Sequence, residues 1–251
     1  MDTAIFIQAR LNSTRLPNKV VLEIGDGKTV LEILMSRLKK IKSKVEIVII
    51  TPSFQKENKL ISLCKKKNWN IFSGSENDLL DRHYKAAKKF KVKNIIKIPS
   101  DCVFMDPCIV DDIISYYNIN NYDYVSNLHP ETYPYGFDVE IMNFKTLEIA
   151  WKQSKETYER EHTTPFILNN PKLFKIGNFI MPSGEDFSKK YRIVLDYQED
   201  FDLLKLIYEN FNQKGKYCNL QDIIDFLENN KAVANINKMH INSQWYNNLD
   251  L

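Results

Sequence analysis

The feature that most constrains the fold is an alternation of buried-strand and amphipathic-helix patterns in the first part of the chain. The segment "VEIVIIT" (45–51) is a continuous β-branched run, as a strand buried on both faces requires. The segment "KTVLEILMSRLKKI" (28–41) instead carries its apolar residues at helical spacing. The alternation predicts further strands at 4–9, 69–74 and 94–101 and further helices at 56–67 and 76–90, the last with Ser75 as its cap. This order predicts a parallel sheet with helices on both faces.

The second half of the chain is less regular and predicts some antiparallel pairing. Strand patterns occur in "YDYVSN", "FDVEIM", "LFKIGN" and "YRIVLD". Helical patterns occur at 144–154, 160–169, 198–213 and 219–229. No linker, repeat or low-complexity tract divides the chain, so we expect one domain over residues 1–251. The predicted fold class is a three-layer α/β/α domain with a mostly parallel, mixed sheet.

Composition excludes several classes of function. The 35 Lys and Arg residues and 32 Asp and Glu residues leave a net charge of +3, and the lysines are scattered, which does not indicate a nucleic-acid coat. No apolar run approaches the length of a membrane span, and the N-terminus lacks a signal-peptide pattern. The four cysteines form no C-x-x-C pair. We therefore expect a reduced cytoplasmic protein without nucleic-acid or membrane partners.

Charged side chains follow three of the predicted strands at the points where those strands end. Arg10, Arg15 and Lys19 follow the first strand, Asp101 follows "NIIKIPS", and Asp196 follows "RIVL". In open α/β sheets ligands bind at the carboxyl ends of the strands. Arginine and lysine suit phosphate oxygens, and one or two carboxylates with phosphate oxygens suit Mg²⁺. The set therefore indicates a nucleoside triphosphate with Mg²⁺.

Plainer interpretations stay open when each residue is taken singly. A lone cationic loop is commonly a solvated surface, and a lone Asp after a strand commonly caps a turn or helix. The chain contains neither G-x-x-x-x-G-K-[ST] nor G-x-G-x-x-G, so it has no P-loop and no dinucleotide fingerprint. Asp138 and Glu140 lie two apart on one strand face, where they could contact a ligand or merely face solvent. Arg160 and His162 could likewise bind an acceptor or serve as helix-end surface charges.

The block "IQARLNSTRLPNKVVLEI" resembles the nucleotide signature of sugar-acid cytidylyltransferases. The whole chain more closely resembles the spore-coat polysaccharide biosynthesis protein F family of cytidylyltransferases. Further matching blocks follow in order from residue 4 to about 210: "SGSENDLLDRHYKAA", "KIPSDCVFMDP", "DYVSN", "YPYGFDVEIM", "REHTTPFI" and "RIVLDYQEDFDLL". Residues 215–251 match no signature of this family, so we treat them as a C-terminal extension of the single nucleotidyltransferase domain.

The resemblance implies a nucleotide-diphosphosugar-transferase, or Rossmann-like, fold. It also implies transfer of CMP from CTP to an acidic sugar such as a nonulosonic acid, with release of pyrophosphate, for surface polysaccharide or glycan biosynthesis. Mg²⁺ is the implied cofactor, with Asp101 and Asp196 as its ligands, and a homodimer is the expected assembly. The implied catalytic residues are Arg10, Lys19, Asp101 and Asp196. The implied nucleotide-binding residues are Gln8, Ala9, Arg10, Ser13, Arg15, Lys19, Gly74 and Ser100. The implied acceptor-binding residues are Asp138, Glu140, Arg160 and His162.

The chain departs from the family pattern at three positions. Ser73 stands where the family usually has Arg, Ser100 where it has Thr, and Val103 where it has Pro. Two other functions therefore stay open at this point. A glycosyltransferase of the same fold would carry a D-x-D motif after a strand at mid-chain, which we do not find. A non-catalytic nucleotide-binding protein is compatible with Ser73 and Ser100.

Overall fold

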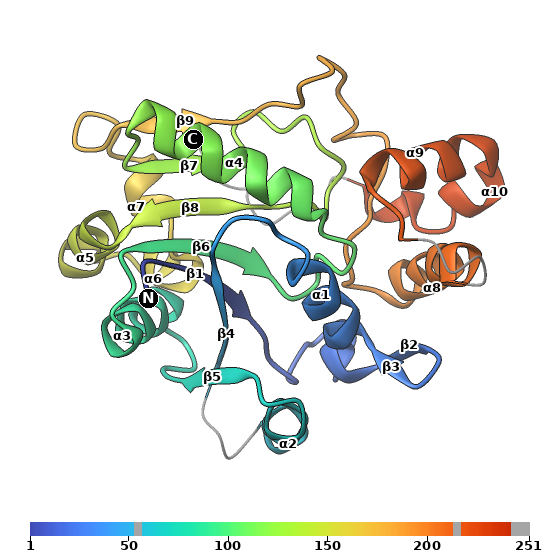
Figure 1. Cartoon of the computed structure of the whole chain (residues 1–251), viewed down its shortest axis with the longest axis horizontal. Coiled ribbons are helices and arrows are strands. Elements are labelled where there is room, and N and C mark those ends of the chain that lie inside the picture. Colours follow the sequence, from blue (N-terminus) through green and yellow to red (C-terminus); the bar gives the residue numbers. More distant parts are fainter. Residues whose placement is uncertain (53–56, 213–216, 242–251) are drawn as a thin grey trace.

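The computed structural model describes residues 1–52, 57–212 and 217–241. Its centre is a seven-stranded sheet in the order β5-β4-β1-β6-β8-β7-β9 (Figure 1). Only β8 runs antiparallel to its two neighbours, and the other strand pairs in this sheet are parallel. The strands are β1 (Thr3–Gln8), β4 (Glu46–Thr51), β5 (Asn70–Ser73), β6 (Asn94–Pro99), β7 (Tyr124–Ser126), β8 (Glu140–Asn143) and β9 (Ile176–Asn178). The mostly parallel, mixed sheet predicted from the alternating pattern is confirmed.

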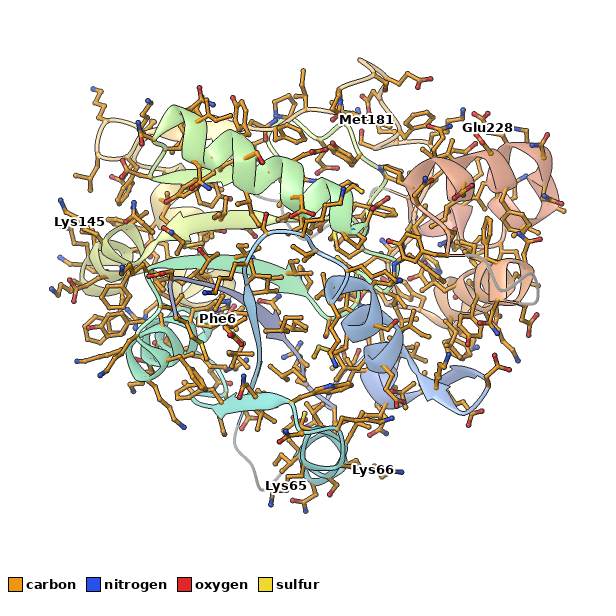
Figure 2. All side chains as sticks on the ribbon, in the orientation of Figure 1. Phe6, Lys65, Lys66, Lys145, Met181 and Glu228 are labelled. Atoms are coloured by element: carbon orange, nitrogen blue, oxygen red, sulfur yellow. The ribbon has the colours of Figure 1, made fainter. Side chains whose placement is uncertain are left out.

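Helices cover both faces of the sheet and complete the three layers (Figure 1). In β1, Ile5 and Ile7 pack on one face while Ala4 and Phe6 pack on the other. The Ile5 face is covered by α1 (Val30–Leu38), α2 (Asn58–Lys66), α4 (Pro107–Asn120), α8 (Gln198–Asn212) and α9 (Leu220–Asn229). The Phe6 face is covered by α3 (Leu79–Phe90), α5 (Phe144–Gln153) and α7 (Pro165–Leu168). Figure 2 shows Phe6 inside the molecule and Lys65, Lys66 and Lys145 at its periphery.

Several predicted elements need correction at their ends. The cap of α3 is Asp78, whose carboxylate accepts a hydrogen bond from the Asp81 backbone amide at 2.8 Å; Ser75 is not its cap. The helix predicted at 160–169 is two helices, α6 (Thr157–His162) and α7, because Thr163 between them has a φ of 74°. Residues 56 and 213, at the ends of two predicted helices, lie outside the described residues.

The segment "YRIVLD" was predicted as a strand, and that prediction is wrong. Its backbone pairs with a loop, not with the central sheet: the Ile193 amide donates to the Tyr135 carbonyl at 2.7 Å. Gly136 makes this approach possible, because a Cβ atom there would lie 2.3 Å from the Ile193 carbonyl oxygen. The segment is thus extended and buried without being a sheet strand.

The C-terminal elements gather at one end of the molecule beside α8 (Figure 1). After α9 come α10 (Lys231–Ala234) and the short 3₁₀ helix η2 (Lys238–His240). The remaining elements are the 3₁₀ helix η1 (Lys19–Val21) and a small hairpin of β2 (Glu23–Gly25) and β3 (Lys28–Thr29). None of the helices in the described ranges is both long enough and apolar enough to cross a membrane.

Candidate active site

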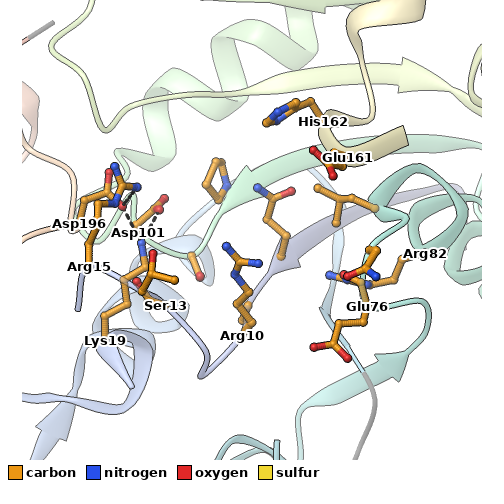
Figure 3. A pocket seen from close by; sticks show the side chains of 17 residues that line it. Arg10, Ser13, Arg15, Lys19, Glu76, Arg82, Asp101, Glu161, His162 and Asp196 are labelled. Carbon is orange, nitrogen blue, oxygen red and sulfur yellow. Dashed lines mark hydrogen bonds and ion pairs between the residues drawn. The ribbon is translucent and has the colours of Figure 1, made fainter. Parts of the chain in front are cut away.

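A cavity of about 440 Å³ opens at the carboxyl ends of β1 and β6. Figure 3 shows Arg15, Lys19, Asp101 and Asp196 on one side of it, and Glu76 and Arg82 on the other side. Arg10 lies between the two groups, and Glu161 and His162 enter from α6. The lining residues are Gln8, Ala9, Arg10, Ser13, Thr14, Arg15, Lys19, Glu76, Asn77, Leu79, Arg82, Pro99, Ser100, Asp101, Glu161, His162 and Asp196. Most of the predicted nucleotide-binding residues therefore meet in one place.

The loop after β1 is shaped by side-chain acceptors, not by glycines. The buried Glu57 carboxylate accepts a hydrogen bond from the Leu11 amide at 2.9 Å. The Ser13 hydroxyl accepts from the Leu16 amide at 3.3 Å, and Asn18 adopts a φ of 59° just before η1 begins. These contacts turn the loop back so that Lys19 reaches the end of the sheet. Sequence reasoning missed Glu57, which lies far from the loop in the chain.

The Lys19 ammonium lies between the two carboxylates that were predicted to hold metal. It donates to Asp101 Oδ2 at 2.8 Å, to Asp196 Oδ1 at 2.9 Å and to the Leu195 carbonyl at 2.8 Å. Burial by itself would lower the pKa of Lys19, but Asp101 and Asp196 raise it. Lys19 is therefore a charged, buried counter-ion in this arrangement.

Backbone pairing explains how Asp101 and Asp196 meet although they are far apart in the chain. The Leu195 amide donates to the Asp101 carbonyl at 3.1 Å, and this bond places Asp196, the residue after Leu195, at the same rim as Asp101. Arg15 adds a second cation beside Lys19, with its guanidinium 2.9 Å from Asp196 Oδ1 and 5.0 Å from the centre of the Tyr197 ring. The predicted convergence of cations and carboxylates is what the structure shows.

The second oxygen of Asp196 faces away from the cavity toward the protein. Arg192 donates to Asp196 Oδ2 at 3.0 Å, and it also pairs with Asp200. Burial would raise the pKa of Asp196, but Lys19, Arg15 and Arg192 together lower it. Asp196 is thus ionised and presents only Oδ1 to the cavity side.

Arg82 lies at the opposite end of the cavity, and Arg10 lies between it and the carboxylates (Figure 3). Arg82 is buried; its Nε donates to the Ser75 carbonyl at 2.8 Å, and one of its Nη atoms donates to the Glu76 carbonyl at 3.0 Å. Burial, followed by the nearby positive charge of Arg10, lowers the pKa of Arg82 to about 10. This end therefore favours an anionic ligand that would relieve the repulsion between the two guanidinium groups.

Gly74, predicted to bind nucleotide, does not line the cavity. It leaves room for Arg82, because a Cβ atom on Gly74 would lie 2.9 Å from Arg82 Cγ. Ser73, at the position where the family usually has Arg, donates its hydroxyl proton to the Pro52 carbonyl at 2.5 Å. In this chain Arg82 supplies the cation at this end of the cavity.

Two predicted acceptor-binding carboxylates lie outside the cavity lining. Glu140 is buried, forms an ion pair with Lys97, and accepts a hydrogen bond from the Tyr124 hydroxyl at 2.9 Å. Burial would raise the pKa of Glu140, but Lys97 lowers it. Asp138 is also buried, and burial, with Glu131 and Asp101 nearby, raises its pKa to about 8. Both side chains are therefore buried inside the protein and lie outside the cavity lining.

The other two predicted acceptor-binding residues, Arg160 and His162, differ in position. Arg160 forms an ion pair with Asp78 at 2.6 Å and donates to the Trp151 carbonyl at 2.9 Å, and it does not line the cavity. His162 does line the cavity, next to Glu161. Burial lowers the pKa of His162, and the positive charge of Lys97 lowers it further, so the imidazole is neutral at pH 7.

The donor set at Asp101 and Asp196 fits a hard divalent cation. Two carboxylate oxygens face one position, where a single ammonium now contacts both. Within the described ranges no group of three or more His, Cys, Asp or Glu side chains could hold a metal ion. Asp101 and Asp196 thus present two carboxylate oxygens toward one position, the kind of donor set that Mg²⁺ commonly uses together with substrate phosphates and water.

Sequence reasoning gave no role to seven of the lining residues. They are Thr14, Glu76, Asn77, Leu79, Arg82, Pro99 and Glu161. Arg82 carried a usable signal, because Leu79 and Arg82 lie three apart on one helix face, directly after a cap at the carboxyl end of a strand. The other lining residues reach the cavity through the way the loops fold over its rim, and local sequence patterns do not predict that folding.

Comparisons with known proteins show the family to which the chain belongs. The sequence profile of a family described as Cytidylyltransferase matches residues 4–238, and so includes part of the C-terminal segment that matched no signature. An uncharacterized protein of Methanocaldococcus jannaschii is 38% identical over 232 residues, 92% of each chain. The spore coat polysaccharide biosynthesis protein SpsF of Bacillus subtilis is 30% identical over 238 residues, covering 93% of this chain and 97% of that one.

Solved structures show the same fold. A cytidylyltransferase from Leptospira borgpetersenii serovar Hardjo-bovis has a TM-score of 0.86 and 32% identity, covering 93% of this chain and 97% of that one. A CMP:2-keto-3-deoxy-manno-octonic acid synthetase complexed with CTP has a TM-score of 0.63 and 12% identity, covering 84% of this chain and 99% of that one, a likeness of fold alone. The chain is therefore a nucleotidyltransferase that belongs to the cytidylyltransferase family.

Proposed function

We propose that this protein transfers CMP from CTP to an acidic sugar, a nonulosonic acid or a similar compound, for the synthesis of a surface polysaccharide or glycan. The observation that carries the proposal is the meeting of Arg10, Arg15 and Lys19 with Asp101 and Asp196 in one cavity at the strand ends. Family membership supports CTP as the nucleotide. The similarity to SpsF supports a role in polysaccharide synthesis.

In the proposed reaction a hydroxyl oxygen of the acceptor attacks the α-phosphorus of CTP. The new bond joins that oxygen to the α-phosphorus, and the bond from the α-phosphorus to its bridging oxygen breaks. The electron pair leaves with pyrophosphate, and the hydroxyl proton passes to water. Such a displacement depends mainly on positioning and on neutralising the charge that develops on the leaving group.

The loop cations supply that neutralisation. Arg10 is exposed and points into the cavity, so its guanidinium can grip phosphate oxygens in a forked contact (Figure 3). Lys19 can reach a phosphate by giving up one of its protein acceptors. Removing a single such contact commonly raises the barrier by roughly 3–4 kcal/mol.

Asp101 and Asp196 are the residues that would hold Mg²⁺. The ion would supply positive charge next to the phosphates and help to orient them. Of the four predicted acceptor-binding residues only His162 lines the cavity, so we assign the acceptor contact to His162 alone. Its neutral imidazole can accept a hydrogen bond from an acceptor hydroxyl.

Calorimetric titration with CTP, ATP, GTP and UTP in the presence of Mg²⁺ tests the nucleotide. We expect CTP to bind at least about tenfold more tightly, about 1.4 kcal/mol, than each of the others. Equal affinity for all four would contradict the proposal.

Titration with CTP and CMP separates the loop cations from general charge effects. Arg10→Ala should weaken CTP more than CMP, because the contact is to the leaving phosphates. Lys28→Ala, which removes an exposed lysine of the small hairpin, is the matched control and should change neither. An equal loss of CMP and CTP affinity in Arg10→Ala would show that Arg10 supports the fold instead.

A further inference from the structure

The C-terminal segment after α9 returns to the loop that carries Asp196. Asn237 lies there with only 2% of its surface exposed, although it follows a short exposed helix. Its side-chain amide donates to Asp200 Oδ1 at 2.7 Å and to the Arg192 carbonyl at 2.9 Å. One amide group thus joins the C-terminal segment to both ends of the 192–200 loop.

Asp200 is the centre of this contact and is wholly buried. Its Oδ2 accepts from the Asp196 amide at 2.9 Å and from the Tyr197 amide at 3.0 Å. Its two oxygens also accept from Arg192, from Nε at 2.9 Å and from an Nη at 3.0 Å. A buried carboxylate keeps its charge only with such partners. Losing one donor therefore weakens the whole set of hydrogen bonds around it.

Arg192 links this centre to the cavity. Its guanidinium is held in a forked pair by Asp200 and uses the same Nη to donate to Asp196 Oδ2 at 3.0 Å. This contact occupies Oδ2 and leaves Oδ1 turned toward Lys19 and Arg15. The direction in which Asp196 presents its free oxygen therefore depends on where Arg192 is held.

A second set of contacts links the same C-terminal segment to the cavity. The His240 ring stacks on Tyr197 at 3.8 Å between centres, with 2° between the planes. Tyr197 in turn contacts Arg15, whose guanidinium lies 5.0 Å from the Tyr197 ring centre. The segment at 237–240 thus supports two side chains that line the cavity.

We propose that Asn237 is a positioning residue for nucleotidyl transfer, which acts through Asp200 and Arg192 to aim Asp196 Oδ1 at the metal position. This inference rests on the proposed function, in which Asp196 is a metal ligand. Without the Asn237 amide, Asp200 Oδ1 keeps Arg192 Nε but loses its other donor, and the Arg192 carbonyl loses its donor as well. With part of its support lost, Arg192 shifts, and Asp196 turns with it.

Mn²⁺ binding without nucleotide is the direct test, measured by calorimetry on the full chain. Asn237→Ala should bind Mn²⁺ about tenfold more weakly, equivalent to about 1.4 kcal/mol, and should need correspondingly more Mg²⁺ for half-maximal turnover. Asn237→Asp, which sets an acceptor against Asp200, should be worse than Asn237→Ala. Asn235→Ala, an exposed asparagine of the same segment, is the matched control and should bind Mn²⁺ as the wild type does.

Two further variants separate positioning from simple loss of stability. Ile224→Val removes one buried methyl group from α9 and lowers the melting temperature without touching Asp200, so Mn²⁺ affinity should hold. In an Arg192→Lys background the effect of Asn237→Ala on Mn²⁺ affinity should nearly vanish, because both act through one contact.

The outcomes distinguish this inference from the proposed function. If wild type and Asp196→Asn bind Mn²⁺ equally, the metal role of Asp196 fails, and the positioning role falls with it. If Asp196→Asn loses Mn²⁺ while Asn237→Ala retains wild-type affinity, only the positioning role is overturned. Equal loss in Asn237→Ala and Ile224→Val at equal melting temperature would also overturn it.

Discussion

At the scale of single residues, Lys19 cannot serve all of its assigned partners at once. Its three ammonium donors are taken up by Asp101, Asp196 and the Leu195 carbonyl. A divalent ion between the same carboxylates would take the place of the ammonium, and a phosphate would need one of its donors. We therefore expect Lys19 to compete with the metal when nucleotide is absent and to contact phosphate when nucleotide is bound.

Lys19→Met tests this competition. Its Mn²⁺ affinity without nucleotide should rise by about tenfold over the wild type, because the ion no longer displaces a buried ammonium. Turnover should fall, because the phosphate contact is lost. Arg10→Met removes the same charge from the same cavity without a carboxylate contact and should leave Mn²⁺ affinity much closer to wild type. Unchanged or weaker Mn²⁺ binding in Lys19→Met would show that the Lys19 ammonium does not compete with the metal.

His83 gives a prediction about pH that is independent of the metal site. It is wholly buried, its Nδ1 lies 2.9 Å from the Leu79 carbonyl, and within the described residues its Nε2 has no hydrogen-bond partner. Burial lowers the pKa of His83 to about 3, whereas an unfolded histidine titrates near about 6.5. The stability that this neutral imidazole contributes is therefore complete above pH about 6.5 and is lost as pH falls toward 3.

Denaturant unfolding at several pH values measures the His83 effect. Between pH 6 and pH 4 the wild type should lose about 1.4 kcal/mol per pH unit more than His83→Leu does. The other three histidines and the carboxylates are common to both proteins, so their contributions cancel in the difference. Parallel pH profiles for the two proteins would show that His83 does not titrate in this way.

At the scale of elements, the regular part of the fold could be predicted and the loops that build the site could not. The strands of the central sheet up to β6 follow local periodicity, which is why β1 and β4 were predicted close to their observed ends, whereas α1 is shorter than the helical pattern at 28–41. The segment at 191–196 has a strand pattern because it is buried, but its hydrogen bonds go to Tyr135 and Asp101. The hydrophobic pattern of a segment shows that it is buried, but it does not show which segment its backbone pairs with.

Gly136→Ala tests how strongly that loop pairing supports the site. Gly136 has a φ of 116°, and a Cβ atom there would meet the Ile193 carbonyl at 2.3 Å, so the 192–196 segment must move. We expect a loss of more than about 3 kcal/mol in the free energy of unfolding, and loss of turnover although Gly136 does not line the cavity. Gly184→Ala is the matched control, with a φ of 77° and no atom within 4 Å, and should cost only about 1–2 kcal/mol. Equal effects of the two changes would contradict this account.

At the scale of the whole molecule, the cavity joins residues from five parts of the chain: the end of β1 with the loop after it, the start of α3 with the loop before it, the end of β6, α6 and the loop before α8. The rule that ligands bind at strand ends was enough to predict Arg10, Lys19 and Asp101 together. Asp196 was predicted beside them although the segment before it is not a sheet strand, and it lies there because the Leu195 amide pairs with the Asp101 carbonyl. It could not predict that Glu140 and Arg160 would form internal ion pairs with Lys97 and Asp78, because those partners come from distant segments. It also could not predict that Asp138 would be buried outside the cavity lining. The homodimer stays a prediction, which sedimentation equilibrium would test.

Pyrophosphate release tests the central claim most directly. The assay offers CTP, ATP, GTP and UTP in turn to a panel of nonulosonic acids, other sugar acids and phosphorylated compounds, with wild type and Asp196→Asn in parallel. We predict release from CTP only when an acidic acceptor is present, with one CMP-linked product for each pyrophosphate, and loss of most release in Asp196→Asn. Tight CTP binding without release for any acceptor, or equal release by Asp196→Asn, would contradict the account.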